Sequence, residues 1–90
     1  MQNTLEKFRL DGKVCIITGG AGFLGKKHAE AVLDAGGLPV LLDIDQARIE
    51  STVKELKKVF KKETIGFAVD ITDSRALLKI KEQILEKNLV

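Results

Sequence analysis

Apolar residues along the chain alternate between short continuous runs and longer stretches with helical spacing. Three runs have the length of strands: residues 13–18, 38–43 and 64–69. Three stretches have helical periodicity: residues 23–35, 45–62 and 72–88. The first run is apolar on both faces, which is typical of a strand in a sheet covered on both sides. The alternation predicts a three-layer α/β half-domain, βαβαβα, with a parallel sheet of strand order 3-2-1.

Composition places the chain among small single domains. It has 90 residues, of which 44% are hydrophobic and 31% charged, and its net charge is +2. A charge this small indicates neither a nucleic-acid nor a membrane partner. The polar start of the chain, residues 1–13, and the single cysteine favour the cytoplasm. One cysteine and one histidine predict no metal site, and the absence of tyrosine excludes a tyrosine acid or base on this chain.

A glycine-rich loop, residues 18–25, joins the first strand to the first helix. It contains the spacing G-x-G-x-x-G at Gly20, Gly22 and Gly25, in the strand–loop–helix context that gives this motif its meaning. Gly22 leaves the backbone open to a pyrophosphate, and Gly25 lets the helix pack close to the sheet. The free N–H groups of the helix N-terminus would then hold the phosphates.

Asp43 closes the second strand, where a carboxylate accepts hydrogen bonds from the ribose hydroxyls of an adenosine. The same charge repels a 2′-phosphate, and the neighbouring Ile44 offers no positive charge to one, so NAD is favoured over NADP. The alternative for Asp43 is a turn or helix-capping acid, although Asp45 already fills the capping role.

A second nucleotide motif overlaps the loop. Gly20, Gly25 and Lys26 fit most of the P-loop pattern G-x-x-x-x-G-K-[ST]. The next residue is Lys27, which has no hydroxyl for magnesium, and a P-loop leaves Asp43 unexplained. A degenerate P-loop is therefore the remote alternative, and the two lysines are interpreted as solvent-facing charges.

At these residues the chain resembles the short-chain dehydrogenase/reductase family. Thr18, Gly19, Gly22 and Gly25 look like the family's T-G-x-x-G-x-x-G loop, in the spacing of the branch that acts on nucleotide sugars. The segment that leads into the first strand, residues 8–14, is instead similar to the branch of simpler alcohol and ketone reductases. The two features point to different branches.

The resemblance continues after the third strand. Asp70, Ile71 and Thr72 look like the family's D-[VIL]-[TS] element, in which the acid meets the adenine amino group and the aliphatic residue lies by the ring. The alternative for Asp70 is a helix-capping acid, and Thr72 or Asp73 is predicted to begin the third helix.

The resemblance implies a Rossmann fold and an oxidoreductase that transfers a hydride between NAD and a hydroxyl or carbonyl substrate. The implied cofactor site consists of Gly19, Gly22, Phe23, Leu24, Gly25, Asp43, Ile44, Asp70 and Ile71. Residues 1–90 would form the amino-terminal half of the dinucleotide-binding domain. The family's catalytic serine and Tyr-x-x-x-Lys pair would lie beyond Val90, so this truncated chain is predicted to be inactive alone. The alternative class is a non-catalytic nucleotide-binding or self-associating module.

The first strand also predicts a homodimer. In the doubly wound order this strand is central, and its second neighbour would come from beyond Val90. Residues 13–18 then form a sheet edge, and the run from Val14 to Ile17 has none of the charges or prolines that protect edges. Pairing of this strand with its copy would satisfy the backbone. The alternative is that residues 1–10 fold back over the edge.

Overall fold

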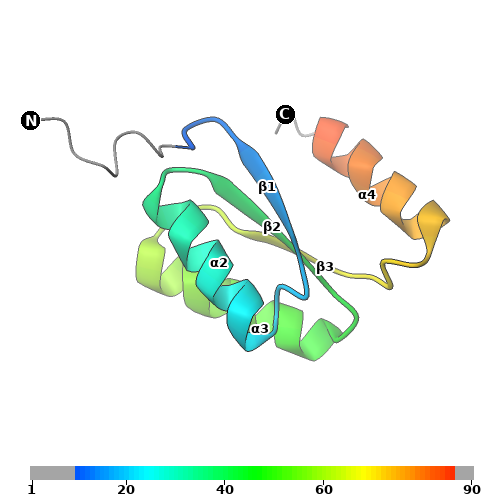
Figure 1. Ribbon diagram of the computed structural model, residues 1–90, viewed down its shortest axis with the longest axis horizontal. Coiled ribbons are helices and arrows are strands. Elements are labelled where there is room, and N and C mark those ends of the chain that lie inside the picture. The colour runs from blue at the N-terminus through cyan, green and yellow to red at the C-terminus, as the bar shows by residue number, and fades with distance from the viewer. Residues whose placement is uncertain (1–9, 87–90) are drawn as a thin grey trace, which may run out of the picture.

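Three strands alternate with three helices in the computed structural model, which describes residues 10–86 (Figure 1). The elements are β1 (Val14–Thr18), α2 (Phe23–Asp34), β2 (Leu38–Asp43), α3 (Gln46–Phe60), β3 (Ile65–Ala68) and α4 (Ser74–Glu86). The predicted end of the last helix at residue 88 lies outside the described residues. Between residues 10 and 86, no helix has both the length and the apolar character needed to cross a membrane.

The strands form one parallel sheet with β2 in the middle. Val14 of β1 pairs with Leu38 of β2, and Val40 of β2 pairs with Ile65 of β3. The order β1-β2-β3 is the predicted order 3-2-1 read from the opposite edge. Helices α2 and α3 cover one face and α4 the other, which gives three layers (Figure 1). The predicted fold class is therefore confirmed.

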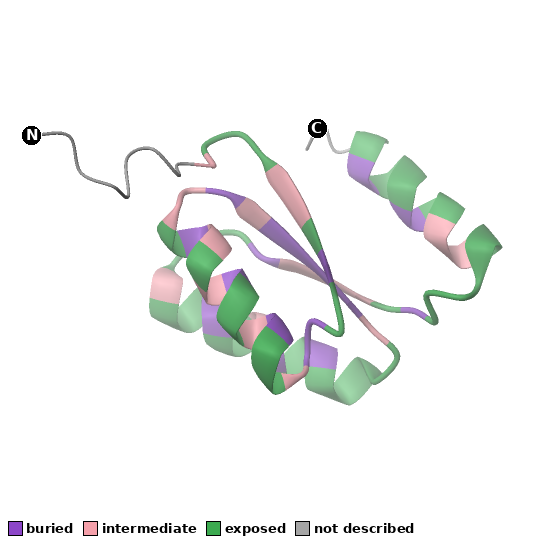
Figure 2. Ribbon diagram, in the orientation of Figure 1, coloured by how far each residue is buried: buried purple, intermediate pink, exposed green. Residues whose placement is uncertain are grey.

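Two apolar cores lie on the two faces of the sheet. The core under α2 and α3 contains Ile17, Ala21, Ala29, Leu33, Leu41, Ile49 and Leu56. The core under α4 contains Val40, Leu42, Val69, Ile80 and Ile84. Leu41 therefore points into one core and its neighbours Val40 and Leu42 into the other. This is why β2 reads as a continuous apolar run and is the most buried strand (Figure 2).

Helix α3 is shorter than its predicted range of 45–62. It begins after Asp45, whose side chain accepts a hydrogen bond from the Arg48 N–H. It ends at Phe60 because Lys61 has a left-handed backbone, with φ of 54°, and donates its N–H to the Lys57 carbonyl. A left-handed residue of this kind closes a helix, usually as glycine. Because this position carries lysine and not glycine, the sequence does not indicate that the helix ends here.

Strand β1 is less buried than its sequence predicts. Ile17 is its one buried residue, whereas Ile16 on the α4 side is 59% exposed. An apolar groove of about 790 Å³ follows this side of the strand. Its walls include Val14 and Ile16 of β1 and Ile80 and Ile84 of α4. Within the described part of the chain, β1 is a sheet edge, as expected, and its outer backbone has no neighbouring strand.

Candidate functional site

The glycine-rich loop turns tightly at the carboxyl end of β1. Gly19 has a φ of 66°, which glycine adopts at little cost, and its carbonyl accepts a hydrogen bond from the Gly22 N–H at 3.0 Å. The Gly20 N–H donates to the Leu42 carbonyl at 3.1 Å, which extends the pairing of β1 with β2 into the loop. The loop is therefore attached to the end of the middle strand.

Gly25 is the glycine that the packing requires most strictly. A Cβ at this position would collide with the carbonyl oxygen of Gly19 and lie 2.7 Å from the Cα of Gly20. Both obstacles are backbone atoms, so no side chain can move aside. A close approach is present at Gly25, but it joins the first turn of α2 to the backbone of the loop and not, as expected, the helix to the sheet.

The N-terminus of α2 presents unused hydrogen-bond donors. Gly22 is the N-cap in an extended conformation, and no side chain caps the helix. The first-turn N–H groups of Phe23, Leu24 and Gly25 have no carbonyl one turn earlier to receive them. The helix dipole adds a partial positive charge at the same place. This end of α2 therefore has the chemistry of a binding site for phosphate oxygens.

The carboxylate of Asp43 lies beside this loop. Its Oδ2 accepts a hydrogen bond from the Ala21 N–H at 3.2 Å, and its Oδ1 accepts one from the Asp45 N–H at 3.1 Å. The cap of α3 is Asp45, so Asp43 does not have the capping role that was one of its alternatives, whereas its bond to the Asp45 N–H is the turn contact that was the other. Asp43 is only half-buried, and its side chain joins the end of β2 to the glycine-rich loop.

Asp70 lies at the end of the neighbouring strand, β3. Its Oδ1 accepts hydrogen bonds from the Thr72 hydroxyl at 2.7 Å and the Thr72 N–H at 2.9 Å. The hydroxyl bond, followed by the N–H bond, lowers the pKa of the Asp70 carboxyl, and a small burial effect opposes them. Asp73 bonds the N–H groups of Arg75 and Ala76 at the start of α4. Capping is therefore done by Asp73, one of the two predicted residues.

Exposed apolar side chains accompany these polar groups. Phe23 and Leu24 begin α2, Ile44 follows β2, and Ile71 follows β3. All four are at least half exposed, with Phe23 the most exposed at 77%. Because the strands are parallel, these positions lie together at the carboxyl ends of the strands. Apolar side chains left in water around convergent polar groups make this end of the sheet a candidate ligand-binding site.

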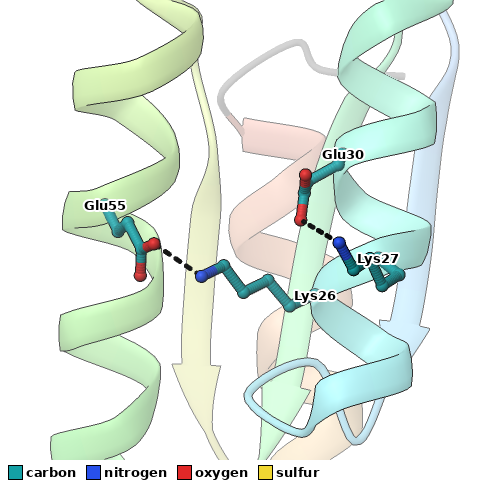
Figure 3. Close-up of polar contacts among 4 residues, drawn as sticks. All are labelled: Lys26, Lys27, Glu30 and Glu55. Carbon is teal, nitrogen blue, oxygen red and sulfur yellow. Dashed lines mark hydrogen bonds and ion pairs between the residues drawn. The ribbon is translucent and has the colours of Figure 1, made fainter.

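Two polar contacts between residues far apart in the sequence were not predicted in this region. Lys26 Nζ donates a hydrogen bond to Glu55 Oε1 at 2.6 Å and so joins α2 to α3, whereas Lys27 forms only an ion pair, at 3.9 Å, with Glu30 within α2 (Figure 3). Lys26 is thus not a free solvent-facing charge, which corrects the sequence interpretation. The guanidinium of Arg48 reaches the loop, where Nη2 donates to the Ala21 carbonyl at 3.1 Å. These pairs are 29 and 27 positions apart, and no local sequence signal indicates them.

A parallel α/β sheet with a glycine-rich loop at the end of its first strand and an acid at the end of its second defines a nucleotide-binding class of protein. The comparison with known families narrows that class. The family model of short chain dehydrogenases matches residues 13–88, and the chain belongs to this family.

Individual relatives agree with the family match. The short chain dehydrogenase/reductase dpchG of Colletotrichum higginsianum is 45% identical over 75 residues, which are 83% of this chain and 28% of the relative. The structure of 2-keto-3-deoxy-D-gluconate dehydrogenase from Streptococcus agalactiae has a TM-score of 0.78 and 30% identity, over 89% of this chain and 30% of that one. The structure of L-sorbose reductase from Gluconobacter frateurii, complexed with NADPH and L-sorbose, has a TM-score of 0.78 and 26% identity. The match covers 86% of this chain and 29% of the reductase. The chain thus spans less than a third of these proteins.

Proposed function

We propose that this chain binds the adenosine and pyrophosphate half of a nicotinamide dinucleotide. The observation that carries the proposal is the uncapped N-terminus of α2 beside the carboxylate of Asp43. Phe23, Leu24 and the loop glycines Gly19, Gly22 and Gly25 would surround the pyrophosphate. Asp43 and Ile44 would hold the ribose, and Asp70 and Ile71 the adenine. The NADPH complex of the similar L-sorbose reductase supports a nicotinamide dinucleotide as the ligand.

Within this proposal, NAD is preferred to NADP because of the charge at the ribose. A 2′-phosphate would enter beside the Asp43 carboxylate, and Ile44 provides no cation to compensate. The proposed reaction of the whole protein is hydride transfer to or from a hydroxyl or carbonyl substrate. The 90 residues contain no tyrosine to act as general acid, so we expect the chain alone to bind dinucleotide without turning it over. Cys15 is a free thiol, and we propose the cytoplasm as its reducing compartment.

The Asp43→Asn variant tests the ribose assignment. Asparagine keeps the shape and an acceptor for the Ala21 N–H but removes the charge. We expect the preference for NAD over NADP, measured as the ratio of dissociation constants in NMR titrations, to fall about tenfold, equivalent to ~1.4 kcal/mol. Asp34→Asn is the matched control, because this exposed acid lies at the far end of α2.

Three outcomes of the titration are distinct. A ratio that falls in Asp43→Asn but not in Asp34→Asn supports the ribose role. Equal affinities for NAD and NADP in the unaltered chain would show that Asp43 does not discriminate between them. Absence of any shift in residues 19–25 with either dinucleotide would remove the binding function itself.

We also propose that two copies of the chain pair through β1, a property favoured by the edge position of β1 among the strands of residues 10–86 and by exposed Ile16. A two-fold axis perpendicular to the sheet would make the two β1 strands antiparallel and keep both α4 helices on one face. The apolar grooves beside the two strands would then meet at the seam. Backbone pairing and apolar burial would be supplied by the same contact.

The Ile16→Lys variant tests this pairing. A lysine in the middle of the edge strand would place a charge in the seam, so we expect the dimer dissociation constant to rise more than tenfold. Light scattering at several concentrations measures it. Val59→Lys, a change at a residue that is 67% exposed on α3, should leave the dimer intact. A folded, unaltered chain that stays monomeric at high micromolar concentration contradicts the pairing.

A further inference from the structure

Ala21 is the residue at which three elements of the site meet. Its N–H donates to Asp43 Oδ2 at 3.2 Å, and its carbonyl accepts from Arg48 Nη2 at 3.1 Å. Both bonds are partly buried, and Ala21 itself is 9% exposed. A carboxylate from the end of β2 and a guanidinium from the first turn of α3 therefore hold the same residue of the loop from its two sides.

We propose that Arg48 is a positioning residue for dinucleotide binding, an inference that rests on the proposed function. The Ala21 carbonyl belongs to the same peptide plane as the Gly22 N–H, which donates to the Gly19 carbonyl at 3.0 Å. Arg48 fixes this plane at one end and Gly19 fixes it at the other. Gly22 is the N-cap of α2, so the orientation of this peptide plane determines the direction in which the N–H groups of the first helical turn point.

The side chain suits this task physically. A guanidinium carries several N–H donors in a rigid plane and keeps its charge at every physiological pH. Its hydrogen bond to a carbonyl is charge-assisted and hence stronger than a neutral one. The bond connects residues 27 positions apart, so it ties the loop to a helix that already packs against the sheet through Ile49 and Leu56.

The same geometry separates the role of Arg48 from that of Asp43. The guanidinium is bonded to the loop backbone, which would serve the pyrophosphate common to NAD and NADP. Removal of Arg48 should therefore weaken both dinucleotides by the same factor. Removal of the Asp43 charge should instead change their ratio. A guanidinium that contacted a 2′-phosphate directly would give a third pattern, the selective loss of NADP.

The test uses Arg48→Met, with Arg48→Lys as the conservative variant and Lys54→Met as the control. Methionine keeps much of the stem without a donor, and Lys54 is an exposed cation on the same helix. Hydrogen exchange without ligand should be several-fold faster at the Ala21 and Gly22 N–H groups in Arg48→Met, with β2 unchanged. Dissociation constants for NAD and NADP should each rise about fivefold, and Arg48→Lys should recover part of both effects.

The outcomes keep the two proposals apart. Faster loop exchange together with an unchanged NAD-to-NADP ratio supports the positioning role. Unchanged exchange, selective loss of NADP, or an equal effect of Lys54→Met overturns it. If the unaltered chain binds neither dinucleotide, the proposed function fails, and so does the positioning role in binding that rests on it. The exchange measurement would then still show whether Arg48 orders the loop.

Discussion

Replacing Gly25 by alanine is expected to cost about 3 kcal/mol of folding free energy and to abolish dinucleotide binding. The added methyl would collide with the Gly19 carbonyl and lie 2.9 Å from the Gly19 carbonyl carbon, so the loop and α2 would have to separate. A domain of this size has a stability of only some 5–13 kcal/mol, so the loss is a large part of the total. Urea unfolding followed by circular dichroism measures it as a lower midpoint at constant slope.

Gly22→Ala is the matched control for this prediction. A Cβ at Gly22 would meet only the Gly19 carbonyl oxygen, at 3.3 Å, and the backbone there is extended. We expect a stability cost below about 1 kcal/mol. Under the proposed function the methyl would lie where the pyrophosphate approaches, so binding should weaken although the fold persists. Equal stability losses in the two variants would contradict the packing role assigned to Gly25.

Leu41→Ala is expected to have the largest effect in the core, about 3 kcal/mol. Leu41 is fully buried on the middle strand, and its cavity would open between the sheet and the helices α2 and α3. Its Cδ2, which alanine lacks, lies 3.1 Å from the position that a Cβ at Gly20 would take, so this atom packs against the loop. The variant should therefore lose affinity for NAD as well as stability, measured by calorimetry and by titration.

An exposed leucine provides the comparison. Leu78 on α4 is 57% exposed, and its replacement by alanine should change the unfolding free energy by less than about 0.5 kcal/mol. If Leu41→Ala and Leu78→Ala shifted the unfolding midpoint equally, the core under α2 and α3 would not be the one described.

The features that sequence reasoning found are those that leave a local pattern. The run 38–42 is apolar at every position because β2 is buried on both faces, and the loop glycines recur at the spacing that the backbone requires. Asp45 and Asp73 stand where helix caps are expected, and both accept N–H bonds there. Short-range rules of this kind depend only on neighbouring residues, so one sequence is sufficient to apply them.

The features that were missed depend on residues distant along the chain. Arg48 reaches Ala21, and Lys26 reaches Glu55, only because the fold brings α2, α3 and the loop together. The exposure of Ile16 depends on what lies beside β1, which its own sequence does not state. These contacts depend on the tertiary arrangement, and no periodic pattern of residues in the sequence indicates them.

The attachment of the glycine-rich loop to β2 makes the site part of the cooperative folding unit. Gly20 bonds the Leu42 carbonyl and Ala21 bonds the Asp43 carboxylate, so the loop is anchored to the last two residues of the strand shared by both cores. Loops tied only to the surface open by local fluctuation, whereas this one is coupled to opening of the sheet. A ligand held by the loop would consequently act on the whole domain, and its free energy of binding would add to the free energy of unfolding.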